Sequence, residues 1–167
     1  MLICLVPLHF AQEGLHDQFV KPFCLFSVKF ESGLTAIVGP NGCGKSNVGD
    51  AIRWVLGEQS SKQLRGSSMQ DVIFNGTKKR KSLSYCEATL LFNNTDRFFD
   101  YDYDELAVTR KLYRSGESEY LINKQPCRLK DIINLFYDSG VGRDGYSIIG
   151  QGQIEKILSG KPEEKRE

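Results

Sequence analysis

The residues best suited to chemistry form one glycine-rich octapeptide. Residues Gly39-Pro40-Asn41-Gly42-Cys43-Gly44-Lys45-Ser46 fit the pattern G-x-x-x-x-G-K-[ST]. Glycines let the backbone wrap closely around phosphate oxygens, and a helix that begins here points its free N–H groups at them. Lys45 can reach β- and γ-phosphates, and the Ser46 hydroxyl can ligate Mg²⁺. The octapeptide therefore predicts a loop that binds a nucleoside triphosphate.

The segments on either side are those that such a loop needs. Before it, residues 34–38 form a short apolar, β-branched run that predicts a buried strand. After it, Gly57 is placed to end a helix. Apolar residues recur at helical spacing in between, at Val48, Ala51, Ile52, Val55 and Leu56. The order strand, loop, helix favours a phosphate loop over a chance glycine turn.

Composition sets looser bounds. The 167 residues suffice for one domain with a core, and 22 basic against 21 acidic residues give a nucleic acid no attraction over the whole surface. The cysteines show no C-x-x-C pair, which favours a reduced protein. They are Cys4, Cys24, Cys43, Cys86 and Cys127. Residues 1–8 are apolar but lack a basic start and are too short to span a bilayer, so we expect neither signal peptide nor membrane segment.

Downstream of the first helix the pattern changes to alternation typical of antiparallel strands. Ser115-Gly116-Glu117 reads as a hairpin turn between two of them. Strands are predicted at residues 24–30, 85–92, 106–113 and 119–122, and an amphipathic helix at Leu129, Ile132, Ile133 and Phe136. The sequence thus predicts an α/β phosphate-loop core with a β-rich insertion.

Machinery for cleaving a triphosphate is incomplete. Hydrolysis usually needs an acidic residue at the end of an apolar strand to hold Mg²⁺. Asp138 is the best candidate, but the apolar residues before it have helical period, so it is predicted to end a helix instead. The segment Gly140-Val141-Gly142-Arg143-Asp144-Gly145 matches a dinucleotide fingerprint. It follows a helix rather than a strand, which predicts a glycine-punctuated loop.

Several longer segments resemble, in order and spacing, the amino-terminal head of the SMC (structural maintenance of chromosomes) ATPases. They are residues 33–47, 50–60, 64–66, 71–74, 113–120, 142–144 and 146–153. The resemblance implies an ABC-type P-loop NTPase half-head with an antiparallel β subdomain. In that family the two half-heads lie at opposite ends of a long chain, joined by a coiled coil and a hinge. It implies a lobe over residues 19–160, an atypical segment at 1–18 and the start of a coiled-coil arm at 161–167.

The resemblance also assigns residues to an ATP and Mg²⁺ site. Gly39 to Asn47 would form the ATP phosphate loop, and Gln151 matches a glutamine that contacts Mg²⁺ and senses the γ-phosphate. Arg65 matches an arginine that reaches toward the phosphates. Without the resemblance, Gln151 and Arg65 are ordinary polar loop residues. The signature motif and second acidic motif belong to the carboxy-terminal half, and Leu158-Ser159-Gly160 resembles the former by coincidence only.

The partners implied by the resemblance are a carboxy-terminal half-head, a second head in an ATP-dependent dimer, a kleisin-type subunit and DNA, with no membrane. The implied location is the cytoplasm, in association with the chromosome. A basic run, Lys78-Lys79-Arg80-Lys81, offers DNA phosphates a local patch. A solvated loop explains the same run equally well.

Two departures and three alternatives accompany the resemblance. Residues 1–17 match nothing in the family, and Gly49 replaces a branched apolar residue at a helix position where glycine costs about 1 kcal/mol. The alternatives are a truncated, non-functional SMC fragment, a related ABC-type DNA-repair ATPase and a small P-loop kinase or GTPase. The last is weakest, because Asn123-Lys124-Gln125-Pro126 lacks the aspartate of a guanine-specific motif.

Overall fold

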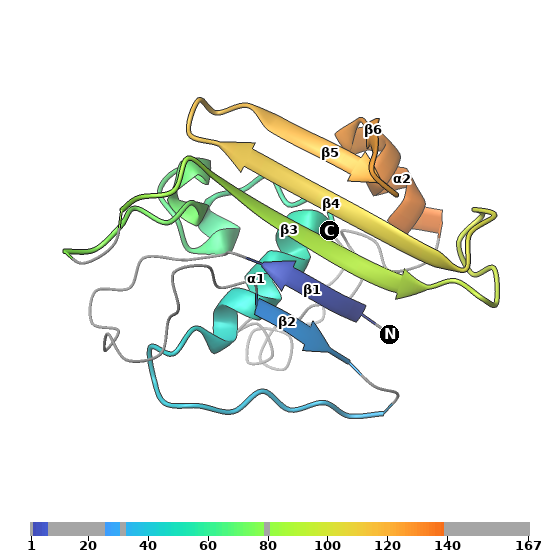
Figure 1. Ribbon diagram of the computed structural model, residues 1–167, viewed down its shortest axis with the longest axis horizontal. Coiled ribbons are helices and arrows are strands. Elements are labelled where there is room, and N and C mark those ends of the chain that lie inside the picture. The colour runs from blue at the N-terminus through green and yellow to red at the C-terminus, as the bar shows by residue number, and fades with distance from the viewer. Residues whose placement is uncertain (1, 7–25, 31–32, 79–80, 139–167) are drawn as a thin grey trace, which may run out of the picture.

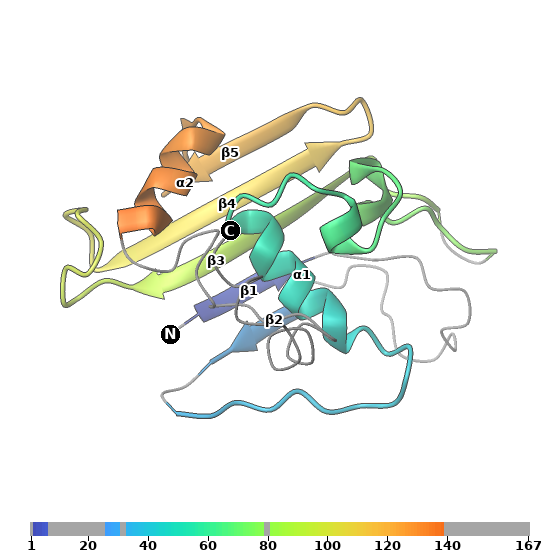
Figure 2. The same cartoon turned by 180° about the vertical axis from the view of Figure 1, so that it is seen from behind.

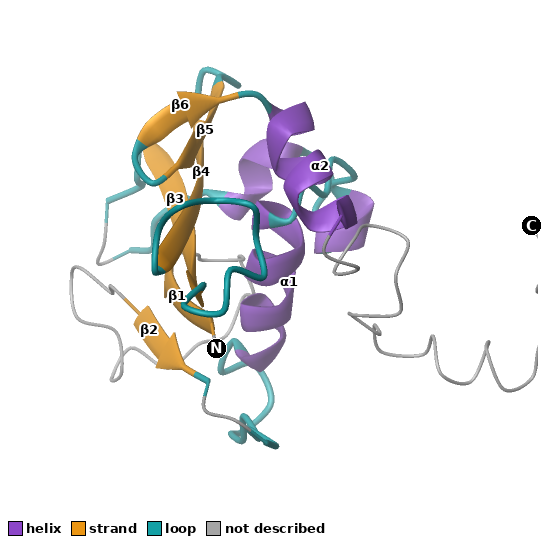
Figure 3. Cartoon of the chain, turned by 90° about the vertical axis from the view of Figure 1, so that its right-hand side faces the viewer, coloured by secondary structure: helices purple, strands orange, loops and turns teal. Residues whose placement is uncertain are grey.

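The computed structural model describes residues 2–6, 26–30, 33–78 and 81–138, which form a sheet with helices on one of its faces (Figures 1 and 3). Six strands, all antiparallel to their neighbours, lie in the order β2-β1-β3-β4-β5-β6. The strands are β1 (Leu2–Val6), β2 (Phe26–Lys29), β3 (Tyr85–Asn93), β4 (Glu105–Tyr113), β5 (Ser118–Ile122) and β6 (Gln125–Cys127). The helices are α1 (Lys45–Val55) and α2 (Leu129–Asp138), with short 3-10 turns η1 (Lys62–Leu64) and η2 (Met69–Val72).

Alternation builds the centre of the sheet. Along β3, Cys86, Ala88 and Leu90 are buried while the residues between them are not. β4 pairs with β3 from Tyr85 opposite Tyr113 to Asn93 opposite Glu105, and its buried residues alternate in the same way. The predicted strands 85–92, 106–113 and 119–122 are confirmed. So is the turn between the last two, in which Gly116 has a φ of 92°.

α1 crosses the face of the sheet with one side buried (Figure 2). Ala51, Trp54 and Val55 belong to the core, and the helix ends as predicted at Leu56 and Gly57, where Gly57 has a φ of 111°. The Gly57 N–H donates to the Trp54 carbonyl at 3.2 Å. α2 also follows the prediction, with Ile132 and Phe136 buried.

Three features differ from expectation. Residues 34–38 form no strand, and Leu34 is 99% exposed and Val38 87% exposed. A buried strand of this apolar kind needs paired neighbours and a covering layer, and no strand within the described residues supplies them. Conversely, residues 2–6, for which no strand was predicted, form β1 between β2 and β3. The polar stretch 60–68 likewise contains η1, whose Leu64 is fully buried.

Candidate nucleotide-binding site

The phosphate loop has a backbone that favours glycine at two positions, and a third glycine lies close to a side chain. Gly42 and Gly44 have φ values of 81° and 91°, in the left-handed region that side chains disfavour. At Gly39, an added Cβ would lie 2.6 Å from the Sγ of Cys43. The loop therefore presents its backbone closely, as a cradle for phosphate oxygens must.

The start of α1 is suited to an anion. Gly44 occupies its N-cap and provides no side-chain hydrogen bond, and no acidic residue lies in the first turn. The N–H groups at a helix start have no partner within the helix and carry the positive end of the helix dipole. Ser46, in the first turn, is exposed. These features fit the phosphates of a nucleotide.

Lys45 folds back over the loop from which it projects. Its Nζ donates to the carbonyl oxygens of Gly39 at 2.6 Å and Pro40 at 2.7 Å, and lies 3.8 Å from the Sγ of Cys43. The ammonium group thus already lies against the backbone of the loop. Phosphate oxygens carry more negative charge than carbonyl oxygens and compete well for the same donor.

Arg65 is held against the first turns of α1. Its Nε donates to Oδ2 of Asp50 at 2.8 Å, and its Nη2 to Oδ1 of Asn47 at 2.9 Å. Asp50 is buried, and Arg53 also faces it at 3.5 Å. The structure therefore brings Arg65 and Asn47 together beside the phosphate loop. The partnership with Asp50 was not predicted, although an aspartate among the buried positions of an amphipathic helix signals a nearby cation.

The other predicted site residues lie either outside the described part of the chain or in other elements. Gln151 and the segment 140–145 lie outside the described residues, as do Lys79 and Arg80. Lys78 and Lys81 are exposed in the loop that leads into β3. Asp138 is the last residue of α2, as predicted for a helix end. In the described part of the chain, no three His, Cys, Asp or Glu side chains gather into a group that could hold a metal ion.

Sequence reasoning missed one buried charged residue near the other end of α1. Arg110 of β4 is 1% exposed and donates to backbone carbonyls at the helix's carboxy-terminal end. The signal was an arginine at a core-facing position of an alternating strand, between Val108 and Leu112. A buried arginine needs acceptors, and helix ends offer unpaired carbonyls.

An α/β chain with this loop before this helix belongs to the class of P-loop NTPases. The family described as "RecF/RecN/SMC N terminal domain" matches residues 18–160. "Chromosome partition protein Smc" of Bacillus subtilis (strain 168) is 61% identical over 140 residues, which are 84% of this chain and 12% of that protein. The corresponding protein of Clostridium kluyveri is 56% identical over 151 residues. The chain belongs to the SMC family.

Solved structures agree with this assignment. A chain from "Structural biochemistry of ATP-driven dimerization and DNA stimulated activation of SMC ATPases" matches with a TM-score of 0.80 and 41% identity, over 84% of this chain and 85% of that one. An Smc head bound to the C-winged helix domain of ScpA matches with a TM-score of 0.78 and 41% identity, over 81% and 42%. The fold is therefore that of an ABC-type SMC ATPase head, as the sequence predicted.

The match covers a small part of the relatives. The chain spans 12–13% of the length of the Bacillus and Clostridium proteins. Among the described helices, none is both long and apolar enough to cross a membrane.

Proposed function

We propose that this chain is the ATP-binding half of an SMC-like ATPase that acts in chromosome condensation and segregation. The observation that carries the proposal is the glycine cradle at the uncapped start of α1, with the Lys45 ammonium group lying over it. An acceptor-rich polyanion is the ligand that such a cradle binds best. The lobe proper is residues 19–160, to which segment 1–18 adds β1, and residues 161–167 begin a coiled-coil arm.

Each site residue has a proposed role. Residues 39–47 surround the phosphates, Lys45 neutralises the β- and γ-oxygens, and Ser46 and Gln151 hold Mg²⁺. Arg65, anchored by Asp50, places its guanidinium at the margin of the loop. When bound, Mg²⁺ supplies charge neutralisation at the phosphates.

Completion by a carboxy-terminal half-head fits the exposed run at residues 34–38. Apolar residues with high strand propensity stay out of water once a neighbouring strand pairs with them. Hydrolysis would require that half, because the signature and second acidic motifs lie there. One matched structure concerns the ATP-driven dimerisation of SMC ATPases, and another is an Smc head bound to the winged-helix domain of ScpA. We extend both partners, a second head and a kleisin-type subunit, to this chain as proposals.

Contact with DNA through the basic run is part of the same proposal, and so is a place on the chromosome in the cytoplasm. Lys78 and Lys81 are exposed, so that phosphates can approach them. Replacing all four basic residues, Lys78, Lys79, Arg80 and Lys81, with glutamine should weaken DNA stimulation of ATP hydrolysis in the completed head. It should also make the logarithm of the DNA-binding constant depend less steeply on the logarithm of the salt concentration. Unchanged stimulation at low salt would contradict the contact.

The test of nucleotide binding uses the head assembled from this chain and a carboxy-terminal half-head. Calorimetric titration with Mg²⁺-ATP should show binding, and Lys45→Ala should weaken it at least ~100-fold because the phosphates lose their main cation. Lys130→Ala, at an exposed position of α2, is the matched control and should leave the affinity unchanged. If Lys45→Ala retained the affinity of the unsubstituted head, the phosphate loop would not be the nucleotide site.

A further inference from the structure

Arg110 joins the antiparallel sheet to the carboxy-terminal end of the phosphate-loop helix. It projects from β4, and its Nη1 donates to the carbonyl oxygens of Trp54 and Glu58, each at 2.7 Å. The last carbonyls of a helix have no partner within the helix. A single buried guanidinium therefore contacts both the final turn of α1, where the Trp54 carbonyl also accepts from the Gly57 N–H, and the turn that follows it.

Two aromatic rings hold the same guanidinium in place. Its Cζ lies 4.9 Å from the centroid of the Trp54 ring and 5.2 Å from that of Tyr120. Tyr120 of β5 is paired directly with Arg110 across the sheet. Cation–π contacts gain strength when the cation is removed from water. Burial is the main cause that lowers the pKa of Arg110, while Tyr120, Cys86 and Glu58 act in the opposite direction.

The other end of α1 is the phosphate site. The helix has 11 residues, so its two ends are about 16 Å apart and joined by a stiff element. Residues 34–38, before the loop, pair with none of the described strands. The direction of the N–H groups at the start of α1 therefore depends on what holds the helix itself: its buried face, Arg65 beside its first turns and Arg110 at its other end.

We propose that Arg110 is a positioning residue of the nucleotide site. By clamping the final turn of α1 to the β4–β5 hairpin, it fixes the axis along which the helix start meets the phosphates. The inference rests on the proposed nucleotide binding. A purely structural arginine would stabilise the fold without favouring the nucleotide, and this difference makes the role testable.

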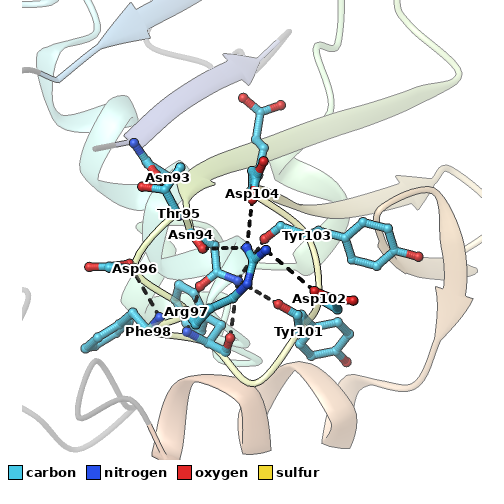
Figure 4. Close-up of polar contacts among 12 residues, drawn as sticks. Asn93, Asn94, Thr95, Asp96, Arg97, Phe98, Tyr101, Asp102, Tyr103 and Asp104 are labelled. Atoms are coloured by element: carbon cyan, nitrogen blue, oxygen red, sulfur yellow. Dashed lines mark hydrogen bonds and ion pairs between the residues drawn. The ribbon is translucent and has the colours of Figure 1, made fainter.

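A second buried polar residue provides the control. Asn94 is fully buried and organises the β3–β4 loop, as Figure 4 shows. Its Nδ2 donates to the carbonyls of Phe99, Tyr101 and Tyr103, and its Oδ1 accepts from the Phe99 N–H at 2.8 Å. All these partners lie within the loop itself. Asn94→Ala should therefore lower stability without reaching α1.

The experiment measures Mg²⁺-ATP affinity of the assembled head with Arg110→Met, Arg110→Lys and Asn94→Ala, at a temperature where each variant is folded. Arg110→Met keeps the bulk but loses the charge and both hydrogen bonds, so we expect at least a tenfold loss of affinity. Arg110→Lys keeps the charge and one donor nitrogen, so it should lose less ATP affinity than Arg110→Met. Asn94→Ala should stay within twofold of the unsubstituted head despite a lower melting temperature.

Hydrogen exchange at Gly57 and Glu58 supplies a second readout, because their N–H groups donate within the same helix end. Faster exchange there, together with weaker ATP binding in Arg110→Met, is the expected result. An affinity equal to that of Asn94→Ala would overturn the positioning role and leave the proposed function standing. If Arg110→Met does not fold, Arg110→Lys decides: an unchanged affinity overturns the proposal. No ATP binding by the unsubstituted head would overturn the proposed function itself.

Discussion

The antiparallel sheet and the phosphate-loop region differ in how their apolar residues are covered. Leu90 of β3 and Val108 of β4 are opposite one another and fully buried. Leu34 and Val38, before the phosphate loop, are almost fully exposed. Both segments are apolar and strand-prone, but only the first finds strand partners in the described part of the chain. The difference separates the sheet, which the described residues stabilise, from the phosphate-loop region, which we propose that a carboxy-terminal half-head completes.

The largest expected effect is a contrast between two leucines. Leu90→Ala should lower the free energy of unfolding of the chain alone by about 2–5 kcal/mol, because it leaves a cavity in the core. Leu34→Ala should change it by less than about 0.5 kcal/mol, since that side chain contacts mainly water. Urea denaturation of each variant measures both. Equal losses would show that residues 34–38 are already packed.

The same two leucine variants also distinguish the two regions in the assembled head. With a carboxy-terminal half-head present, Leu34→Ala should weaken the association of the two halves, whereas Leu90→Ala should act through folding of this chain. Calorimetric titration of one half into the other separates the two effects. Association that is indifferent to Leu34 would place the completing contact elsewhere.

Asp71 holds the start of η2 by hydrogen bonds. The Ser67 and Ser68 N–H groups each donate to its Oδ2 at 2.8 Å, and the Ser68 hydroxyl donates to Oδ1. The backbone hydrogen bond from Ser68 is the main cause that lowers the pKa of this carboxyl. Asp71→Asn should therefore lower the free energy of unfolding by about 1 kcal/mol at neutral pH. Chemical denaturation measures it, with Asp100→Asn at an exposed position of the β3–β4 loop as control.

The pH dependence follows from the direction of that shift. Because the folded pKa is lower than the unfolded value of about 3.9, the carboxylate stabilises the fold above that value. This contribution is lost as the pH falls through the folded pKa. The stability difference between the unsubstituted chain and Asp71→Asn should shrink with acidification below about pH 4. A difference that grew on acidification would contradict the capping role.

The smallest effect concerns α1, which links the two regions. A Cβ added at Gly49 would meet nothing within 4 Å, and its backbone is ordinary helix. Gly49→Ala should stabilise the chain by about 0.8 kcal/mol, measured by thermal unfolding. Gly57→Ala is the matched control and should destabilise, because Gly57 has a φ of 111° and its Cβ would lie 3.0 Å from Ile133 Cγ1. Destabilisation by Gly49→Ala would show that α1 packs more tightly there.

Local patterns predicted those elements whose partners are close in the chain. The alternation in residues 85–92, the Gly116 turn and the helical spacing that ends at Gly57 all concern neighbours within about thirty residues. The phosphate loop was predictable for the same reason, since its glycines and Lys45 act within one octapeptide.

Long-range partners were not predictable from pattern. Residues 34–38 find no strand partner among the described residues, and an apolar run alone could not say whether it is covered. Residues 2–6 lie between β2 and β3, and β3 is distant in the chain, so no local pattern could predict this pairing. The contacts of Arg65 with Asp50 and of Arg110 with the end of α1 join residues 15 and more than 50 positions apart.

Amide hydrogen exchange at residues 34–38 tests most directly whether the phosphate-loop region is the incomplete half of a shared head. We predict rapid exchange in the chain alone, beside slow exchange in β3 and β4, and strong protection of residues 34–38 when a carboxy-terminal half-head is added. Slow exchange there in the chain alone, or no protection in the assembled head, would contradict the shared head.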